Sequence, residues 1–225
     1  MSGATAREEI VPPALRIVRR IRAGAAAVAA LMAHVAGWNY VACAVFITFD
    51  IVARSFLGFS SKATVEITGY MLAGGIAWAL AHALARRSHI RVDVLVNRLP
   101  VWLRAWLHLL SLGLLGVLAV LIAWAALELV DESALFDAHD NSAMRVPLVV
   151  PQGIWTFGIL AFVLMLGTLL LESALALALG RGADVDRLLG SRSLEDETQE
   201  ALAAVAMAHD ATSEAEEAGK KATPR

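Results

Sequence analysis

The sequence predicts an all-α integral membrane protein with four transmembrane helices, an N-terminal interfacial helix and both termini in the cytoplasm. Four runs without Asp, Glu, Lys or Arg support this prediction, at residues 23–49, 67–85, 105–127 and 146–171. A helix rises about 1.5 Å per residue, so even the shortest run covers about 28 Å, close to the apolar thickness of a bilayer. The chain is also 58% hydrophobic, with a mean hydropathy of +0.64. This is more apolar than a soluble domain of 225 residues requires.

A closed β-barrel is the other structure that can cross a bilayer. Barrel strands show an alternation of apolar and polar residues over about ten positions. The runs in this chain are continuous and roughly twice that length, so they predict helices.

The positions of the basic residues set the expected orientation, because Lys and Arg close to a span tend to remain in the cytoplasm. Of the 19 Lys and Arg residues, 16 lie in the N-terminal arm, the second connection or the tail. The first and third connections contain only Arg54, Lys62 and Arg145. The run at 23–49 exceeds the roughly 7 to 15 apolar residues of a secretory signal, so we expect a permanent helix there.

Three segments are expected along the chain. Residues 1–22 form a basic arm, which reads either as an interfacial helix with arginines at headgroup level or as a disordered leader. Residues 23–180 form the four-helix transmembrane unit. Residues 181–225 contain ten acidic residues, six basic residues and no aromatic residue, which predicts a disordered cytoplasmic tail with at most a short helix at 194–207.

Small residues recur every four positions in the first two spans and predict close helix packing, because small side chains let two backbones approach in lipid. They are Ala25, Ala29, Ala33 and Gly37 in the first span, and Gly69, Ala73, Ala77, Ala81 and Ala85 in the second. Trp38 and Trp78 lie deep in their spans and are expected to pack between helices.

Charged residues gather at the ends of the spans. Asp50 and Arg54 are four residues apart and can pair along one helix face, while Glu66 opens the second span. Glu172 lies near the inner headgroups, which favours a salt bridge or a solvated edge over a proton relay. The sequence contains no catalytic constellation, metal-ligand spacing or phosphate-binding loop, so we expect no enzyme activity, cofactor, metal or nucleic-acid partner.

Histidines support an alternative from another functional class. His34, His82 and His108 fall in the cytoplasmic halves of three different spans, and two imidazoles at one depth can ligate haem. The alternative is therefore a haem- or quinone-binding membrane anchor of an electron-transfer complex. Cys43 is the single cysteine, so no intrachain disulfide is possible.

The second connection is the most distinctive part of the sequence. It contains His89-Ile90-Arg91-Val92-Asp93, followed by Leu99-Pro100 and then Arg104 at the start of the third span. This segment resembles the small permease (Q, or DctQ-type) subunit of tripartite ATP-independent periplasmic (TRAP) transporters. In that family a run of His, apolar, basic, apolar and Asp follows the second helix and leads to a Leu-Pro step.

Other positions agree with the resemblance, which covers about residues 23–180. Ala53-Arg54 and Phe56 end the first span, Glu66 opens the second, and Ser142 with Val146-Pro147 and 151–153 precede the fourth. The chain departs from the family at 64–65 and after Pro147, where tryptophans that are common in the family are absent.

The resemblance implies a bacterial inner-membrane subunit that partners a large multi-helix permease subunit and a periplasmic substrate-binding protein. It implies secondary, commonly sodium-coupled, uptake of organic acids. It also implies Arg54 and Glu66 as outer-face partner contacts, and His89, Arg91 and Asp93 as a cytoplasmic structural site. In this site Asp93 would accept charge-assisted hydrogen bonds from nearby basic residues.

Overall fold

Four long helices account for most of the computed structural model. The structure describes residues 12–58, 63–86, 99–142, 144–189, 198–199, 201–203 and 205–208. The long helices are α1 (Pro13–Leu57), α2 (Thr64–Ala85), α4 (Val101–Leu135) and α5 (Val149–Ala178), and a short helix, α6 (Gly182–Leu189), follows them. Each long helix is apolar enough over a sufficient length to cross a membrane, which confirms the four predicted spans. The described residues contain no β-strand.

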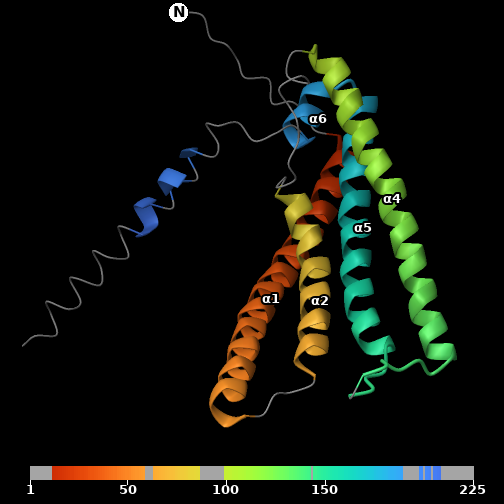
Figure 1. The fold of residues 1–225 in the computed structure, drawn as a ribbon. Helices are drawn as coiled ribbons and strands as arrows, with labels where there is room; N and C mark the ends of the chain where they lie inside the picture. The colour runs from red at the N-terminus through yellow and green to blue at the C-terminus, as the bar shows by residue number, and fades with distance from the viewer. Residues whose placement is uncertain are drawn as a thin grey trace, which may run out of the picture. The chain divides into compact units, whose positions relative to one another are not determined.

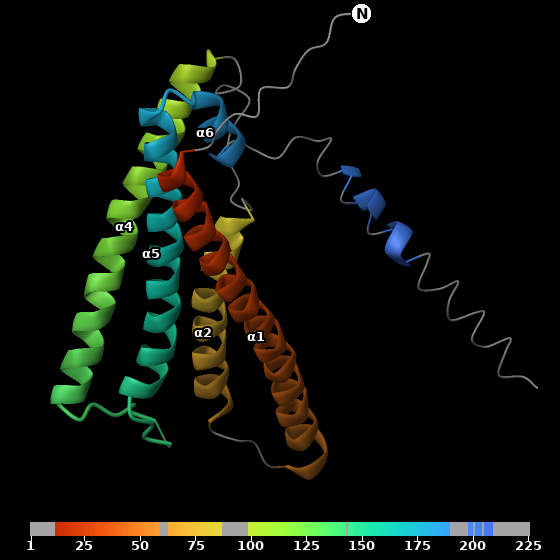
Figure 2. The same cartoon turned by 180° about the vertical axis from the view of Figure 1, so that it is seen from behind.

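The long helices form a row in the order α1, α2, α5, α4 (Figure 1). The opposite view in Figure 2 shows the same order. Both α2 and α4 pack on α5, and α1 packs on α2 along most of the length of α2. The N-terminal end of α1 also reaches α5, whereas its C-terminal end lies away from α5 in both views. A row leaves two broad apolar faces that no part of the described chain covers.

Helix α1 begins in the predicted arm and continues through the first span without a break. Pro13 occupies its first turn, where the missing N–H costs nothing. Residues 13–22, for which an interfacial helix and a disordered leader were both open, are thus helical, and Leu15 and Val18 on them are buried. The sequence after Arg22 is rich in alanine, the best helix former, so nothing interrupts the helix there. It ends at Gly58, whose φ of 69° is the left-handed cap conformation.

Helices α2 and α5 approach closely at Gly158. A Cβ atom on Gly158 would lie 2.6 Å from the carbonyl carbon of Ala77, so no side chain larger than hydrogen fits. Ala77 and Ala81, both in the predicted ridge of small residues, are buried. The docking interpretation is confirmed for these two residues, whereas Gly69 and Ala73 of the same ridge are exposed.

The two deep tryptophans differ in their surroundings. Trp78 donates a hydrogen bond to the carbonyl oxygen of Ile154 at 2.8 Å, and its ring lies 5.7 Å from that of Phe157, so it packs between α2 and α5 as predicted. Trp38 is 74% exposed, contrary to the prediction, because it projects from α1 on the side away from α2.

The packed unit extends beyond residue 180, where the tail was expected to begin. Val185 and Leu189 of α6 are buried in the same hydrophobic cluster as Ala105 of α4 and Ala176 of α5. Apolar residues at 185, 188 and 189 lie on one face of a helix, which explains why this segment packs. Residues 190–225 form a separate unit, whose described residues, all between 198 and 208, are helical.

Candidate functional site

The predicted contact residue Arg54 lies at the outer end of α1, where the predicted topology places the periplasm. Its Nη2 atom is 2.8 Å from Oδ2 of Asp50, one turn earlier, which confirms the expected pairing. The Asp50 side chain is 5% exposed and that of Arg54 is 64% exposed. The buried carboxylate therefore holds a guanidinium that remains accessible to a partner.

The second predicted contact residue, Glu66, lies in the first turn of α2. Its Oε2 atom is buried and has no hydrogen-bond partner within the described chain. One turn later, Tyr70 donates a hydrogen bond to Oδ2 of Asp140 at 2.5 Å. Asp140 belongs to the connection between α4 and α5, so this bond ties that connection to α2.

The α4–α5 connection, residues 136–148, is a short irregular hairpin. Its amides pair at two points, from Asp140 N–H to the Val146 carbonyl and from Leu148 N–H to the Ala138 carbonyl, each at 2.9 Å. Asp137 and Arg145 both have positive φ angles, near 48°, which are uncommon for residues with a side chain. The backbone is therefore held in a defined conformation at the outer end.

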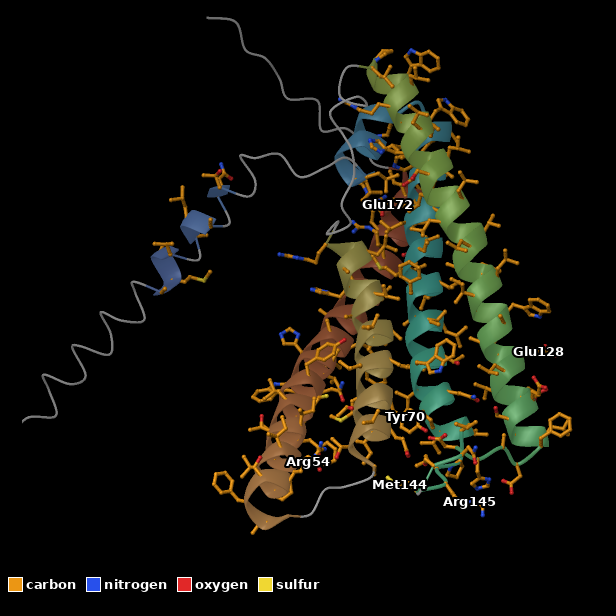
Figure 3. The ribbon with its side chains drawn as sticks, in the orientation of Figure 1. Arg54, Tyr70, Glu128, Met144, Arg145 and Glu172 are labelled. Carbon is orange, nitrogen blue, oxygen red and sulfur yellow. The ribbon has the colours of Figure 1, made fainter. Side chains whose placement is uncertain are left out.

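Acidic side chains collect at this outer end. Glu128, Asp131, Glu132 and Asp137 are exposed at the end of α4 and just after it, beside exposed Leu135 and Phe136. Figure 3 shows Arg54, Tyr70, Met144 and Arg145 at one end of the molecule and Glu172 towards the other. Within residues 128–148, Arg145 is the only Lys or Arg.

A second cluster of charges lies at the inner end and joins three helices. Glu172 of α5 is 3% exposed and binds Arg19 at 3.1 Å and Arg22 at 2.5 Å, both from α1. Arg19 also contacts Asp184 of α6 at 3.2 Å, and Arg181 contacts Asp184 at 2.9 Å. The salt bridge anticipated for Glu172 is confirmed, and it fixes the start of α1 against the end of α5.

The three histidines lie in three different environments. His34 is exposed, His82 is half-buried and His108 is 7% exposed. Nδ1 of His34 is 2.7 Å from the carbonyl oxygen of Ala30 in its own helix. Nδ1 of His82 is buried and has no hydrogen-bond partner within the described chain. The predicted cytoplasmic residues His89, Arg91 and Asp93 lie outside the described residues.

Sequence reasoning missed two contacts, Tyr70 with Asp140 and Arg19 with Asp184. Tyr70 and Asp140 are 70 residues apart, and Arg19 and Asp184 are 165 residues apart, so no local spacing in the sequence could reveal these contacts. A single Tyr in a span close to its outer end was the available signal for the first pair. Two arginines three residues apart, opposite a lone acid at the inner end of another span, were the signal for the inner cluster.

Comparison with known proteins identifies the family. No curated protein and no solved structure matches the chain. The model of the family described as tripartite ATP-independent periplasmic transporters, DctQ component, matches residues 43–177. The match begins within α1 and includes α2, α4 and nearly all of α5, which is more than half of the chain. The chain therefore belongs to the DctQ family and is a small membrane subunit of a TRAP transporter.

Proposed function

We propose that this chain enlarges and steadies the fixed part of a large permease subunit, while its outer connections help to receive a periplasmic substrate-binding protein. Transport by the whole complex would be secondary and sodium-coupled, with an organic acid as substrate, as the family resemblance implies. The membrane would be the bacterial inner membrane, with both termini of this chain in the cytoplasm.

The apolar character of the four spans at mid-membrane is the observation on which this proposal depends. A solute carrier needs a polar interior at the midplane of the membrane, usually with an ionisable residue or a broken helix. The four predicted spans have uncharged middles. A cavity of about 410 Å³ between α1, α2 and α5 is lined by apolar residues apart from Asn39 and Tyr70. Such a chain is suited to supporting a transport pathway in another subunit.

The rigid attachments at both ends support a structural role. Glu172 joins α1, α5 and, through Arg19, α6 at the inner end. The bond from Tyr70 to Asp140 joins α2 to the α4–α5 connection at the outer end. These long-range bonds keep a one-layer arrangement from sliding apart, which a supporting subunit requires.

The outer acidic residues support the proposed docking role. By the predicted topology the outer side carries seven acidic residues and three basic residues: Asp50, Glu66, Glu128, Asp131, Glu132, Asp137 and Asp140 against Arg54, Lys62 and Arg145. Four of these acids, Glu128, Asp131, Glu132 and Asp137, are exposed, and an acidic surface attracts a partner with a basic face and orients it during the encounter. Arg54 and Glu66 remain candidate contacts on the same side, and His89, Arg91 and Asp93 remain a candidate structural site on the inner side.

Reconstitution tests the proposal. The large permease subunit from the same genome is placed in liposomes with and without this chain, and uptake of a labelled dicarboxylate is measured with the binding protein outside and a sodium gradient imposed. We expect uptake only when both membrane subunits are present, and loss of uptake when the gradient is removed. Full uptake by the large subunit alone would refute the supporting role. Uptake by this chain alone would refute the assignment of the pathway to the other subunit.

A further inference from the structure

Helix α1 has two seams of mainly apolar residues, and only one of them packs against another helix within the described part of the chain. The buried seam faces α2 and includes Ala29, Met32, Ala36, Cys43, Asp50 and Ala53. The opposite positions are all exposed and are separated by alternating steps of three and four residues. We call them the free seam: Gly24, Ala27, Leu31, His34, Trp38, Val41, Val45, Thr48 and Val52. This spacing is the one with which two helices pack at a small crossing angle.

The centre of the free seam is polar at the middle of the membrane. The nearest charged residues on α1 are Arg22 and Asp50. His34 lies 12 residues from Arg22, and Trp38 lies 12 residues from Asp50, or about 18 Å in each case at 1.5 Å per residue. Neither side chain can reach the headgroups from this depth. Trp38 is 74% exposed and His34 is also exposed.

Whether His34 and Trp38 already make hydrogen bonds determines which partner atoms each ring still lacks. The Ala30 carbonyl oxygen, 2.7 Å from Nδ1 of His34, can only accept, so Nδ1 carries the hydrogen and donates. With the hydrogen on Nδ1 alone, Nε2 of the imidazole is an acceptor. Nε1–H of Trp38 is a donor, and it makes no hydrogen bond within the described part of the chain. Lipid tails can satisfy neither atom, and a polar atom left unsatisfied in hydrocarbon is costly.

We infer that the free seam of α1 binds a transmembrane helix of the large permease subunit that presents a hydroxyl or carboxamide side chain at mid-membrane. This inference rests on the proposed function. Such a side chain can donate to His34 Nε2 and accept from Trp38 Nε1–H at once, because His34 and Trp38 are neighbours one turn apart on the same face. The flanking residues Leu31, Val41 and Val45 supply the apolar contacts.

A second copy of this chain is a poorer occupant. Two copies inserted in the same direction are related by a two-fold axis along the membrane normal, and this axis places each residue opposite its own equivalent. His34 would then face His34 and Trp38 would face Trp38. A hydrogen bond between the copies would then have to join His34 of one to Trp38 of the other, one turn apart in depth, rather than two residues that face each other directly.

Co-purification measures the contribution of the two rings. The tagged full-length chain is co-expressed with the large permease subunit from the same genome, and the captured subunit is quantified in mild detergent. An interhelical hydrogen bond in membranes contributes about 0.6 kcal/mol on average, so His34→Leu and Trp38→Phe should each weaken association roughly threefold and the double variant about tenfold. His34→Gln restores an acceptor and should recover most of the loss.

Trp124→Phe is the matched control, because Trp124 is 65% exposed on α4 and undergoes the same substitution. Capture should be unchanged by it. Equal capture by the wild-type chain and the double variant would overturn the inference while leaving the proposed function intact. No capture by the wild-type chain would instead refute the proposed function.

Photo-crosslinking identifies the occupant directly. Benzoylphenylalanine in place of Val41 should attach to a transmembrane segment of the large subunit, whereas the same group in place of Val117, exposed on α4, should give that product weakly or not at all. Attachment of a second copy of this chain, or of lipid alone, at position 41 would overturn the inference.

Discussion

Arg22 Nε lies 2.5 Å from Oε2 of Glu172, 150 residues later in the chain, and this bond joins the beginning of α1 to the end of α5. Glu172 accepts from Arg19 as well, so one buried carboxylate binds two guanidinium groups, on side chains that are 39% and 29% exposed. Substitution of Glu172 removes the acceptor of both arginines. Removing one partner of a buried ion pair usually destabilises a protein by more than the pair itself stabilises it.

Glu172→Gln should therefore lower the free energy of unfolding in detergent by about 2 kcal/mol, below the full cost for a buried pair because the arginines are partly exposed. Thermal unfolding followed by near-ultraviolet circular dichroism checks this. Arg20→Gln, on the exposed side of the same turn of α1, is the control and should have little effect. Equal midpoints for the two variants would contradict the structural role of Glu172.

Gly158→Ala should destabilise the bundle by about 1–3 kcal/mol, because the added methyl group would lie 2.6 Å from the backbone of Ala77 and must push α2 away from α5. The matched control is Gly153→Ala, five residues earlier on α5, where an added Cβ has nothing within 4 Å. The same unfolding assay applies. A stable Gly158→Ala variant would mean that α2 and α5 are further apart than described.

Tyr70→Phe should loosen the α4–α5 connection and leave the spans intact. The variant loses only the hydroxyl that donates to Asp140. One lost hydrogen bond of about 1 kcal/mol corresponds to roughly fivefold faster exchange of the amide hydrogens of Asp140 and Leu148. Hydrogen exchange with mass spectrometry measures this, and peptides from the centre of α5 should be unaffected.

Reversal of the acidic charges at the outer end of α4 tests the docking proposal. Replacing Glu128, Asp131 and Glu132 by Lys should weaken binding of the substrate-binding protein to the reconstituted complex severalfold, more at low salt than at high salt, because exposed charges are screened. Light-scattering or surface-binding measurements can record the affinity of the substrate-binding protein at each salt concentration. The control replaces Glu214, Glu216 and Glu217 of the tail by Lys, which should not change binding from outside the membrane.

Asp93→Ala tests the cytoplasmic motif. If Asp93 ties the second connection to the helix ends, the variant should reduce the amount of assembled complex in detergent extracts more than it reduces substrate affinity. Quantitative co-purification measures the first effect and uptake at varied substrate concentration the second. Unchanged assembly would remove the structural role from His89, Arg91 and Asp93 together.

The spans could be predicted from the sequence because the requirement for an uncharged run of bilayer length is local. The pairing of Asp50 with Arg54 was predictable for the same reason, since the two residues are one helical turn apart. The depth of Glu172 reduced its expected state to a salt bridge or a solvated edge, and the structure shows the salt bridge.

The arrangement of the spans could not be predicted in the same way. Apolar runs show that helices meet lipid or each other, but they do not distinguish a closed bundle from a row. The exposure of Trp38 follows from the row, since α1 has a neighbour on one side only. The burial of α6 was missed because its acidic surroundings dominate the composition, although Val185, Leu188 and Leu189 share one face.

The packing of α4 on helices that follow it in the chain has a consequence for membrane insertion. Among the described helices, α4 packs on α5 and α6, both of which follow it in the chain. During translation α4 therefore enters the bilayer before any of its neighbours exists, whereas α2 can pair with α1 as soon as it emerges. A helix that enters the bilayer without a neighbour must be apolar enough to be stable in lipid alone. Among the four spans, α4 has the highest mean hydropathy and α2 the lowest. A nascent chain arrested before residue 149 should hold α4 as a solitary lipid-solvated helix, and assembly should be completed only when α5 leaves the ribosome.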